Sequence, residues 1–276
     1  MTQAPRVADA EFSKRLSTAW DAALYFKFGA ERAQPPLDLV TRIDFTPKRI
    51  VDLGCGPGVS TRMLRDRFPQ ADILAVSNSE EMLVEARRSL PDMRFEETDI
   101  AEWRPSKRPD LIYANSSLQW LPEHETLFPK LMGYLAEGGA LAVQMADNLQ
   151  EPSHSLMRMI AADGPWTSRL APIAKTRAVI GTYVDYYGWL RPLSERLHIW
   201  ETTYVHPLSG VDAVVDWFRS GALRPFLDPL DPREQQEFLE RYKRELADAY
   251  DAAPEGGLLF LYPRLFIYAR KGGEPR

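Results

Sequence analysis

Cysteine and histidine are scarce in this sequence of 276 residues. The one cysteine is Cys55, so no disulfide can form within the chain. The four histidines lie far apart and lack the spacing of zinc ligands. We therefore expect neither a disulfide framework nor a metal site.

Long apolar runs and an excess of positive charge are also missing. No stretch approaches the roughly 20 apolar residues that span a bilayer, and residues 1–12 lack the apolar segment of a secretory signal. The 34 Lys and Arg are outnumbered by 39 Asp and Glu, which leaves a net charge of −5. Binding to nucleic acid or to an anionic membrane needs a basic surface. We expect a cytoplasmic protein with neither partner, and the sequence leaves its oligomeric state open.

Short apolar runs alternate with amphipathic helical segments through the first half of the chain. We predict helices over residues 60–68, 79–89 and 127–135, with Ser79 as an N-cap. Pro35 and Pro36 are expected in the first turn of an earlier helix. Alternation of this kind predicts an α/β fold with parallel strands and right-handed crossovers. The predicted strands cover residues 49–53, 72–76, 93–96, 111–114, 140–145, 199–205 and 258–270.

The alternation stops near residue 148, where mostly helical sequence begins. We predict four segments. They are an N-terminal cap (1–40), a cofactor-binding Rossmann-like core (41–148), a mostly helical substrate lid with one core strand near 199–205 (149–250), and a final core strand with a tail (251–276).

A glycine-rich loop follows the first predicted strand. Asp52 precedes Gly54, Gly56 and Gly58, and glycine suits positions where a ligand approaches the backbone closely. The spacing is G-x-G-x-G and differs from the G-x-G-x-x-G of dinucleotide-binding proteins. It is typical of methyltransferases that bind S-adenosylmethionine, whose ammonium group can interact with a nearby acid. Cys55 is expected to fill space in the loop.

Several segments resemble the trans-aconitate methyltransferases over about residues 20–270. The resemblance implies a seven-stranded, mostly parallel sheet with an antiparallel strand near the C-terminus and a helical lid. It also implies S-adenosylmethionine as cofactor and S-adenosylhomocysteine as its product. The matching segments include residues 24–32, 52–58, 99–100, 115–122, 141–148, 151–154, 221–225 and 260–266.

The resemblance implies roles for single residues around the cofactor. Asp99 would accept hydrogen bonds from the adenine amino group, and Asn115 would face the methionyl end. Trp120 would line the cofactor site or pack in the core. Tyr25 and Arg32 would close over the cofactor, or Arg32 would be a solvated arginine on an amphipathic helix. The predicted cofactor-binding residues are Tyr25, Arg32, Asp52, Gly54, Gly56, Gly58, Ser77, Asn78, Asp99, Ile100, Asn115 and Trp120.

The chain departs from the common pattern at the end of the second strand. Ser77 stands where many such enzymes carry an acid that holds the ribose hydroxyls. A neutral hydrogen bond contributes about 1–2 kcal/mol less than a charged one, so we expect roughly five- to thirty-fold weaker cofactor binding. Glu80 and Glu81 are candidates to compensate.

Carboxyl methylation makes few chemical demands on a protein. A carboxylate is already ionised at pH 7, so we predict positioning without a catalytic base or a metal. The non-reacting carboxylates of a small polycarboxylic acid need cations, and the planar fork of arginine matches a carboxylate. Arg224 and Arg264 are the main candidates, or they form ordinary ion pairs. The full predicted substrate set is Gln144, His154, Tyr183, Trp217, Arg224 and Arg264.

Three other functions fit parts of the pattern. The lid would suit another oxygen or carbon acceptor for the methyl group. An NADP-dependent oxidoreductase would tolerate a serine in place of the acid at position 77, although the glycine spacing argues against this function. A ligand-binding protein without catalysis is the third.

Overall fold

The structure is a computed structural model that describes residues 27–176, 180–219 and 221–272. Tyr25 lies outside these ranges. The chain forms two compact units. The sheet unit comprises Ala30–Ala146, Ile180–Thr202 and Arg264–Arg276, and the helical unit comprises Met1–Gly29, Asp147–Val179 and Thr203–Pro263.

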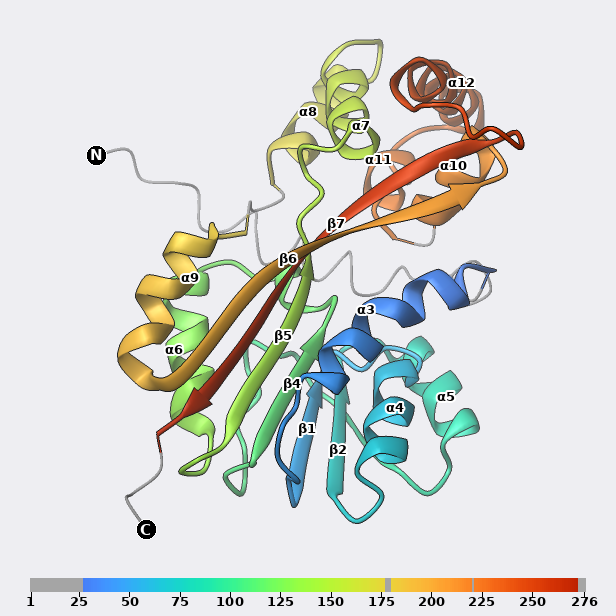
Figure 1. The fold of residues 1–276 in the computed structure, drawn as a ribbon. Helices are drawn as coiled ribbons and strands as arrows, with labels where there is room; N and C mark the ends of the chain where they lie inside the picture. Colours follow the sequence, from blue (N-terminus) through green and yellow to red (C-terminus); the bar gives the residue numbers. More distant parts are fainter. Residues whose placement is uncertain (1–26, 177–179, 220, 273–276) are drawn as a thin grey trace. The chain divides into compact units, whose positions relative to one another are not determined.

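A seven-stranded sheet in the order β3-β2-β1-β4-β5-β7-β6 confirms the predicted fold (Figure 1). The first five strands pair in parallel, and β7 pairs with β5 in the antiparallel sense. The strands are β1 (Arg49–Leu53), β2 (Asp72–Ser77), β3 (Arg94–Glu97), β4 (Leu111–Asn115), β5 (Ala140–Ala146), β6 (Ser194–Leu208) and β7 (Leu258–Lys271).

Alternate residues of the sheet face an apolar core beneath two helices. Leu141, Val143 and Met145 of β5 are fully buried in one cluster with Phe128 and Tyr186. Burial of side chains of this size stabilises a fold by about 1.5–3 kcal/mol each. The helices of the sheet unit are α3 (Gly29–Thr41), α4 (Val59–Arg67), α5 (Glu80–Ser89), η1 (Leu118–Trp120), α6 (His124–Tyr134), α9 (Tyr183–Leu190) and η2 (Arg191–Leu193).

The expected position of Pro35 and Pro36 is wrong. Both prolines lie inside α3 and not in its first turn. Proline lacks the N–H of a helix hydrogen bond, so a break was the natural expectation. Tertiary contacts offset this cost, because both rings are buried and the Pro36 carbonyl accepts a 2.8 Å hydrogen bond from the Tyr113 hydroxyl.

Two other elements differ from the sequence prediction by three residues or more at an end, whereas the Ser79 N-cap is confirmed by a hydrogen bond from the Met82 amide. Helix α6 begins at His124, three residues early, after Glu123 in a left-handed conformation with φ 57°. Strand β6 covers Ser194–Leu208 and extends past both ends of the predicted strand. Strand β6 continues beyond the apolar stretch because its backbone pairing with β7 does not depend on side-chain polarity.

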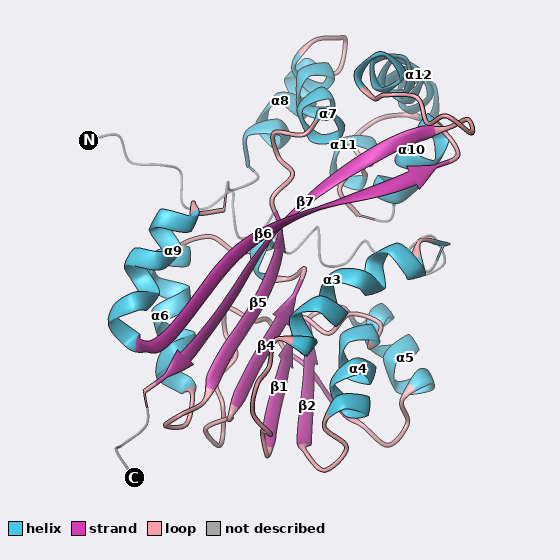
Figure 2. Ribbon diagram, viewed as in Figure 1, coloured by secondary structure: helices cyan, strands magenta, loops and turns pink. Residues whose placement is uncertain are grey.

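The helical unit contains, in its described residues, five helices and the adjoining parts of β6 and β7 (Figure 2), and aromatic side chains pack together in it. Trp217 and Phe260 have ring centroids 5.4 Å apart, and Phe28 lies 5.0 Å from Trp217. Within the described ranges, no helix is both long and apolar enough to cross a membrane. The helices are α7 (Pro152–Ala162), α8 (Thr167–Thr176), α10 (Val211–Arg219), α11 (Arg224–Leu227) and α12 (Pro232–Ala249).

Candidate active site

The loop between β1 and α4 turns through left-handed backbone. Gly54, Gly56 and Gly58 have φ angles of 81°, 53° and 88°, a region that side chains other than glycine rarely adopt. The amides of Gly54 and Cys55 both donate to the Val76 carbonyl, at 2.7 and 2.9 Å. The loop is therefore tied to the end of β2.

Two of these glycines have different surroundings. A Cβ atom at Gly54 would lie 2.2 Å from the Cβ of Ser117, whose hydroxyl donates to the Leu53 carbonyl at 2.7 Å. A Cβ at Gly56 would have no heavy atom within 4 Å. Gly54 is thus required by packing within the protein, whereas Gly56 presents bare backbone to open space. Open backbone of this kind is what a closely bound ligand needs.

Asp52 lies fully buried at the end of β1. One carboxylate oxygen, Oδ2, accepts hydrogen bonds from the hydroxyls of Ser60 (2.8 Å) and Thr61 (2.7 Å). The other oxygen, Oδ1, is buried and has no partner among the described residues. Burial raises the pKa of Asp52 to about 6, although the two hydroxyl bonds oppose the shift. A cation beside Oδ1 would satisfy this carboxylate.

Four polar residues line one face of the sheet at its carboxyl edge. Asp52 of β1 is opposite Tyr113 of β4, and Asn115 is two residues further along the same strand. Asn115 is opposite Gln144 of β5, and Arg264 of β7 pairs with Ala146, two residues beyond Gln144. Residues two apart on a strand share a face. We call Asp52, Asn115, Gln144 and Arg264 the polar row. Ligands of doubly wound sheets bind at this edge.

The β1–β4 end of the polar row offers hydrogen-bond acceptors. The Asn115 amide oxygen is buried without a partner in the part of the chain that the structure describes. Together with Oδ1 of Asp52, two buried oxygens at this end lack donors. An unsatisfied buried polar atom costs about 1–3 kcal/mol. The group that satisfies this end therefore donates hydrogen bonds, as an ammonium does.

The opposite end of the polar row presents donors. Arg264, only 5% exposed, donates from Nη1 to the Ser116 hydroxyl at 2.9 Å. The Ser116 hydroxyl donates to Oε1 of Gln144 at 2.9 Å, and Nη1 of Arg264 also reaches that oxygen at 3.5 Å. Ser116 has a left-handed φ of 54°, which is strained for a serine. This end of the polar row suits an anion.

The other predicted cofactor residues end or follow neighbouring strands. Ser77 is buried at the end of β2, and its hydroxyl accepts a hydrogen bond from the Ser79 amide at 3.2 Å. Asp99 follows β3 and accepts from the Ala101 amide at 2.8 Å. Ile100 lies against the glycine loop, because its Cδ1 would be 3.3 Å from a Cβ at Gly54.

The acids proposed to compensate for Ser77 face solvent. Glu80 and Glu81 are both exposed in the first turn of α5, and Glu80 forms a 2.9 Å ion pair with Arg87. Asn78 is exposed as well.

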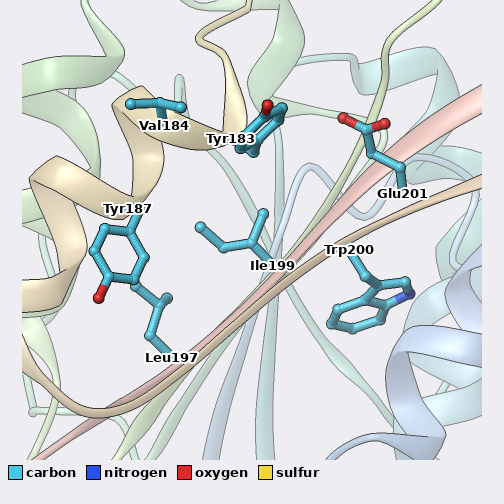
Figure 3. Close-up of a pocket in the computed structure, with 7 residues that line it drawn as sticks. All are labelled: Tyr183, Val184, Tyr187, Leu197, Ile199, Trp200 and Glu201. Carbon is cyan, nitrogen blue, oxygen red and sulfur yellow. The ribbon is translucent and has the colours of Figure 1, made fainter.

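Three predicted residues lie elsewhere in the sheet unit. Arg32 is half-buried on α3, and Trp120 is half-buried in η1. Tyr183 is 61% exposed on α9 and belongs to an open groove of about 620 Å³ (Figure 3). The groove is lined by Tyr183, Val184, Tyr187, Leu197, Ile199, Trp200 and Glu201.

The helical unit holds the remaining substrate candidates. His154 is buried against Phe218, with ring centroids 4.8 Å apart, and Trp217 is buried in the aromatic cluster. Arg224 is half-buried at the start of α11. Asn148 is 1% exposed, and both of its amide atoms lack partners within the described ranges.

Other titratable groups are held in inert settings. His124 contacts the Tyr186 hydroxyl at 2.6 Å and the Leu118 carbonyl at 2.9 Å, and burial lowers its pKa. Burial raises the pKa of the Cys55 thiol, which packs with Ala75. In the described parts of the chain, no three His, Cys, Asp or Glu side chains gather as metal ligands.

Comparison with known proteins shows extensive similarity. The chain is 51% identical to a trans-aconitate 2-methyltransferase of Methylobacterium nodulans, over 91% of this chain and 98% of that protein. It is 46% identical to the enzyme of the same name from Acidovorax ebreus, with the same coverage of both chains. The chain belongs to the trans-aconitate 2-methyltransferase family. The oxidoreductase alternative therefore loses its basis.

A domain family matches part of the chain, and a solved structure shares its fold. A family model described as a methyltransferase domain matches residues 50–139. A crystal structure of the YcgJ protein from Bacillus subtilis is 12% identical and aligns with a TM-score of 0.55, covering 87% of this chain and 99% of that one. This likeness concerns the fold alone.

Some residues of the site had no role in the sequence analysis. Ser116 lies inside the family-like block at residues 115–122, so its location was signalled but its contacts were not. Ser60 and Thr61 hold Asp52, and Ser117 supports Gly54. Only the folded chain brings these hydroxyls to their partners.

Proposed function

We propose that this protein transfers a methyl group from S-adenosylmethionine to a carboxylate of trans-aconitate and forms a methyl ester. The identity of 46–51% to trans-aconitate 2-methyltransferases over 91% of the chain carries the proposal. The polar row supports it, because its acceptor end suits an ammonium group and its donor end suits an anion.

The glycine loop and the buried acceptors fit this cofactor. The open backbone at Gly56 accommodates close approach, and Oδ1 of Asp52 and the amide oxygen of Asn115 would accept from the methionyl ammonium. Ser77 would hydrogen-bond the ribose, and Asp99, with Ile100 beside it, would contact the adenine. When bound, the cofactor supplies an electrophilic methyl group.

The protein's part of the reaction is orientation. The substrate carboxylate is ionised at neutral pH, so no residue needs to remove a proton. The donor end of the polar row would hold a carboxylate while another carboxylate oxygen lies about 3–3.5 Å from the methyl carbon. Exclusion of water is assigned to the lid (149–250) and the cap (1–40).

Further substrate and cofactor contacts are proposed outside the polar row. We assign His154, Trp217 and Arg224 to the acid substrate. Tyr183 is assigned to the same ligand, and Tyr25, Arg32, Asn78 and Trp120 to the cofactor. A small-molecule partner and a cytoplasmic location complete the proposal.

Mass spectrometry tests this function directly. Purified protein is incubated with trans-aconitate and S-adenosylmethionine carrying a deuterated methyl group. We expect a product that gains one labelled methyl group and loses it in mild alkali, as an ester does. A labelled product resistant to alkali would indicate a different acceptor type. Binding of S-adenosylhomocysteine with no product from any carboxylic acid tested would indicate a silent ligand-binding protein.

A further inference from the structure

The hydrogen bonds around Ser116 determine which way the Gln144 side-chain amide points. A guanidinium has only donors, so Nη1 of Arg264 donates to the Ser116 hydroxyl at 2.9 Å. It also lies 3.5 Å from the nearest amide atom of Gln144. That atom must therefore be the oxygen, which accepts the proton of the Ser116 hydroxyl at 2.9 Å.

The amide nitrogen of Gln144 is consequently the atom that is left without a partner. Gln144 is 0% exposed, and its Nε2 has no hydrogen-bond partner in the part of the chain described. Leaving a buried donor unsatisfied is unfavourable. The Gln144 side chain is on the face of β5 opposite Val143 and Met145, which belong to the apolar core. Its free donor thus belongs to the face that carries the polar row.

Two hydrogen bonds fix Ser116 against Gln144. The Ser116 amide donates to the Gln144 carbonyl at 2.9 Å, so one residue bonds both the main chain and the side chain of Gln144. The left-handed φ of 54° places the Ser116 hydroxyl between the two partners. Strained residues persist where the surroundings over-determine them, commonly at functional sites.

We propose that Gln144 donates from Nε2 to a carboxylate of the acid substrate, and that Ser116 and Arg264 are positioning residues that lock its amide. This assignment rests on the proposed function and deepens it. In this assignment Arg264 acts on the acid through Gln144.

The first test replaces Gln144 with its isostere. Gln144→Glu keeps the shape and pairs with Arg264, so the variant should fold, but it turns the unpartnered donor into an acceptor. We expect the KM for trans-aconitate to rise about 10- to 100-fold, with S-adenosylhomocysteine affinity within about three-fold of wild type. Gln236→Glu adds the same charge on the exposed side of α12 and should leave KM unchanged. An unchanged KM in Gln144→Glu, or an equal loss of cofactor affinity, would overturn the assignment.

The second test separates positioning from direct binding. Ser116→Ala and Arg264→Lys are each measured alone and in a Gln144→Met background, which has no amide to orient. We expect each change to raise KM about 3- to 10-fold alone and to have no further effect beside Gln144→Met. Additional loss from Arg264→Lys in the Met background would mean that the guanidinium binds the acid directly.

The two proposals fail in different ways. If wild-type protein forms no ester, the proposed function is wrong. If it forms the ester and the Gln144 variants keep wild-type KM, only the present assignment is wrong. NMR of the Gln144 side-chain amide, identified by its absence in Gln144→Glu, tests the orientation without turnover. Its two proton signals should change when Ser116→Ala frees the amide, and unchanged signals would contradict the locking.

Discussion

The two ends of the polar row are built in different ways. At the β1 end, the turn arises within Asp52–Gly58 from three glycines with positive φ. At the β7 end, Ser116, Gln144 and Arg264 come from three distant parts of the sequence, and 148 positions separate Ser116 from Arg264. One local segment of the sequence determines the first geometry, whereas the second exists only when β4, β5 and β7 lie side by side.

The two ends also differ in the kind of hydrogen-bond partner that they lack. Buried oxygens of Asp52 and Asn115 lack donors at one end. The Gln144 amide nitrogen lacks an acceptor at the other. A methyl donor with an ammonium group and an acid acceptor would satisfy both ends. Substitutions at one end should therefore affect cofactor binding, and those at the other should affect substrate binding.

Gly54→Ala should have the largest effect, because it breaks the β1 end outright. The new Cβ would lie 2.2 Å from Ser117 Cβ, at a φ of 81°. Overpacking and left-handed strain together predict a loss of about 2–5 kcal/mol in the free energy of unfolding. Chemical denaturation measures this loss. Gly133→Ala within α6, where a Cβ meets nothing within 4 Å, should be neutral or slightly stabilising. Equal stability of the two variants would contradict the packing argument.

Asp52→Asn tests the buried carboxylate. Its pKa of about 6 exceeds the ordinary 3.8, so between these values the folded state holds a proton that the unfolded state has lost. Stability should fall as pH rises through this window, by on the order of 3 kcal/mol from this group. Asparagine should abolish that part of the pH dependence, as seen in unfolding free energies of both proteins from pH 4 to 7.

The same variant should weaken S-adenosylhomocysteine binding at pH 7.5 by about 10- to 30-fold, because a neutral amide replaces a charged partner of the ammonium. Calorimetry gives both affinities. Wild-type affinity in Asp52→Asn would remove Asp52 from the ammonium site and leave the acceptor end unexplained.

Gly56→Ala sharpens the distinction between stability and binding. Gly56 and Gly138 both have positive φ, 53° and 70°, and both have open space where a Cβ would lie. Each alanine should cost about 1–2 kcal/mol of stability. Only Gly56→Ala should also weaken S-adenosylhomocysteine binding, by about ten-fold or more, because its methyl group enters the ligand's space. Equal affinities in calorimetry would mean that no ligand approaches Gly56.

Ser77→Asp should have the smallest effect, and a favourable one. Ser77 is buried at the end of β2, where its hydroxyl already accepts from the Ser79 amide. A carboxylate there would face the N-terminus of α5 and could hold both ribose hydroxyls. We expect S-adenosylhomocysteine to bind about 5- to 30-fold more tightly. Unchanged or weaker binding would show that the ribose lies elsewhere.

Much of the fold was predictable because its signals are local. Short runs of four to six residues, most of them apolar, sufficed for the parallel strands, and the glycine spacing located the loop. Helix α3 was mispredicted at Pro35 and Pro36 because the contacts that offset two prolines, such as the Tyr113 hydroxyl on Pro36, come from another strand.

The sequence by itself determined the alternation of strands and helices, the glycine turn and membership of the family, since each depends on residues close together in the chain. Tertiary structure decided the rest. Strand register placed Asp52, Asn115, Gln144 and Arg264 on one face. Hydrogen bonds from Ser116 and Arg264 then oriented the Gln144 amide. A side-chain amide carries a donor and an acceptor, and only neighbours brought together by folding select which one faces the ligand.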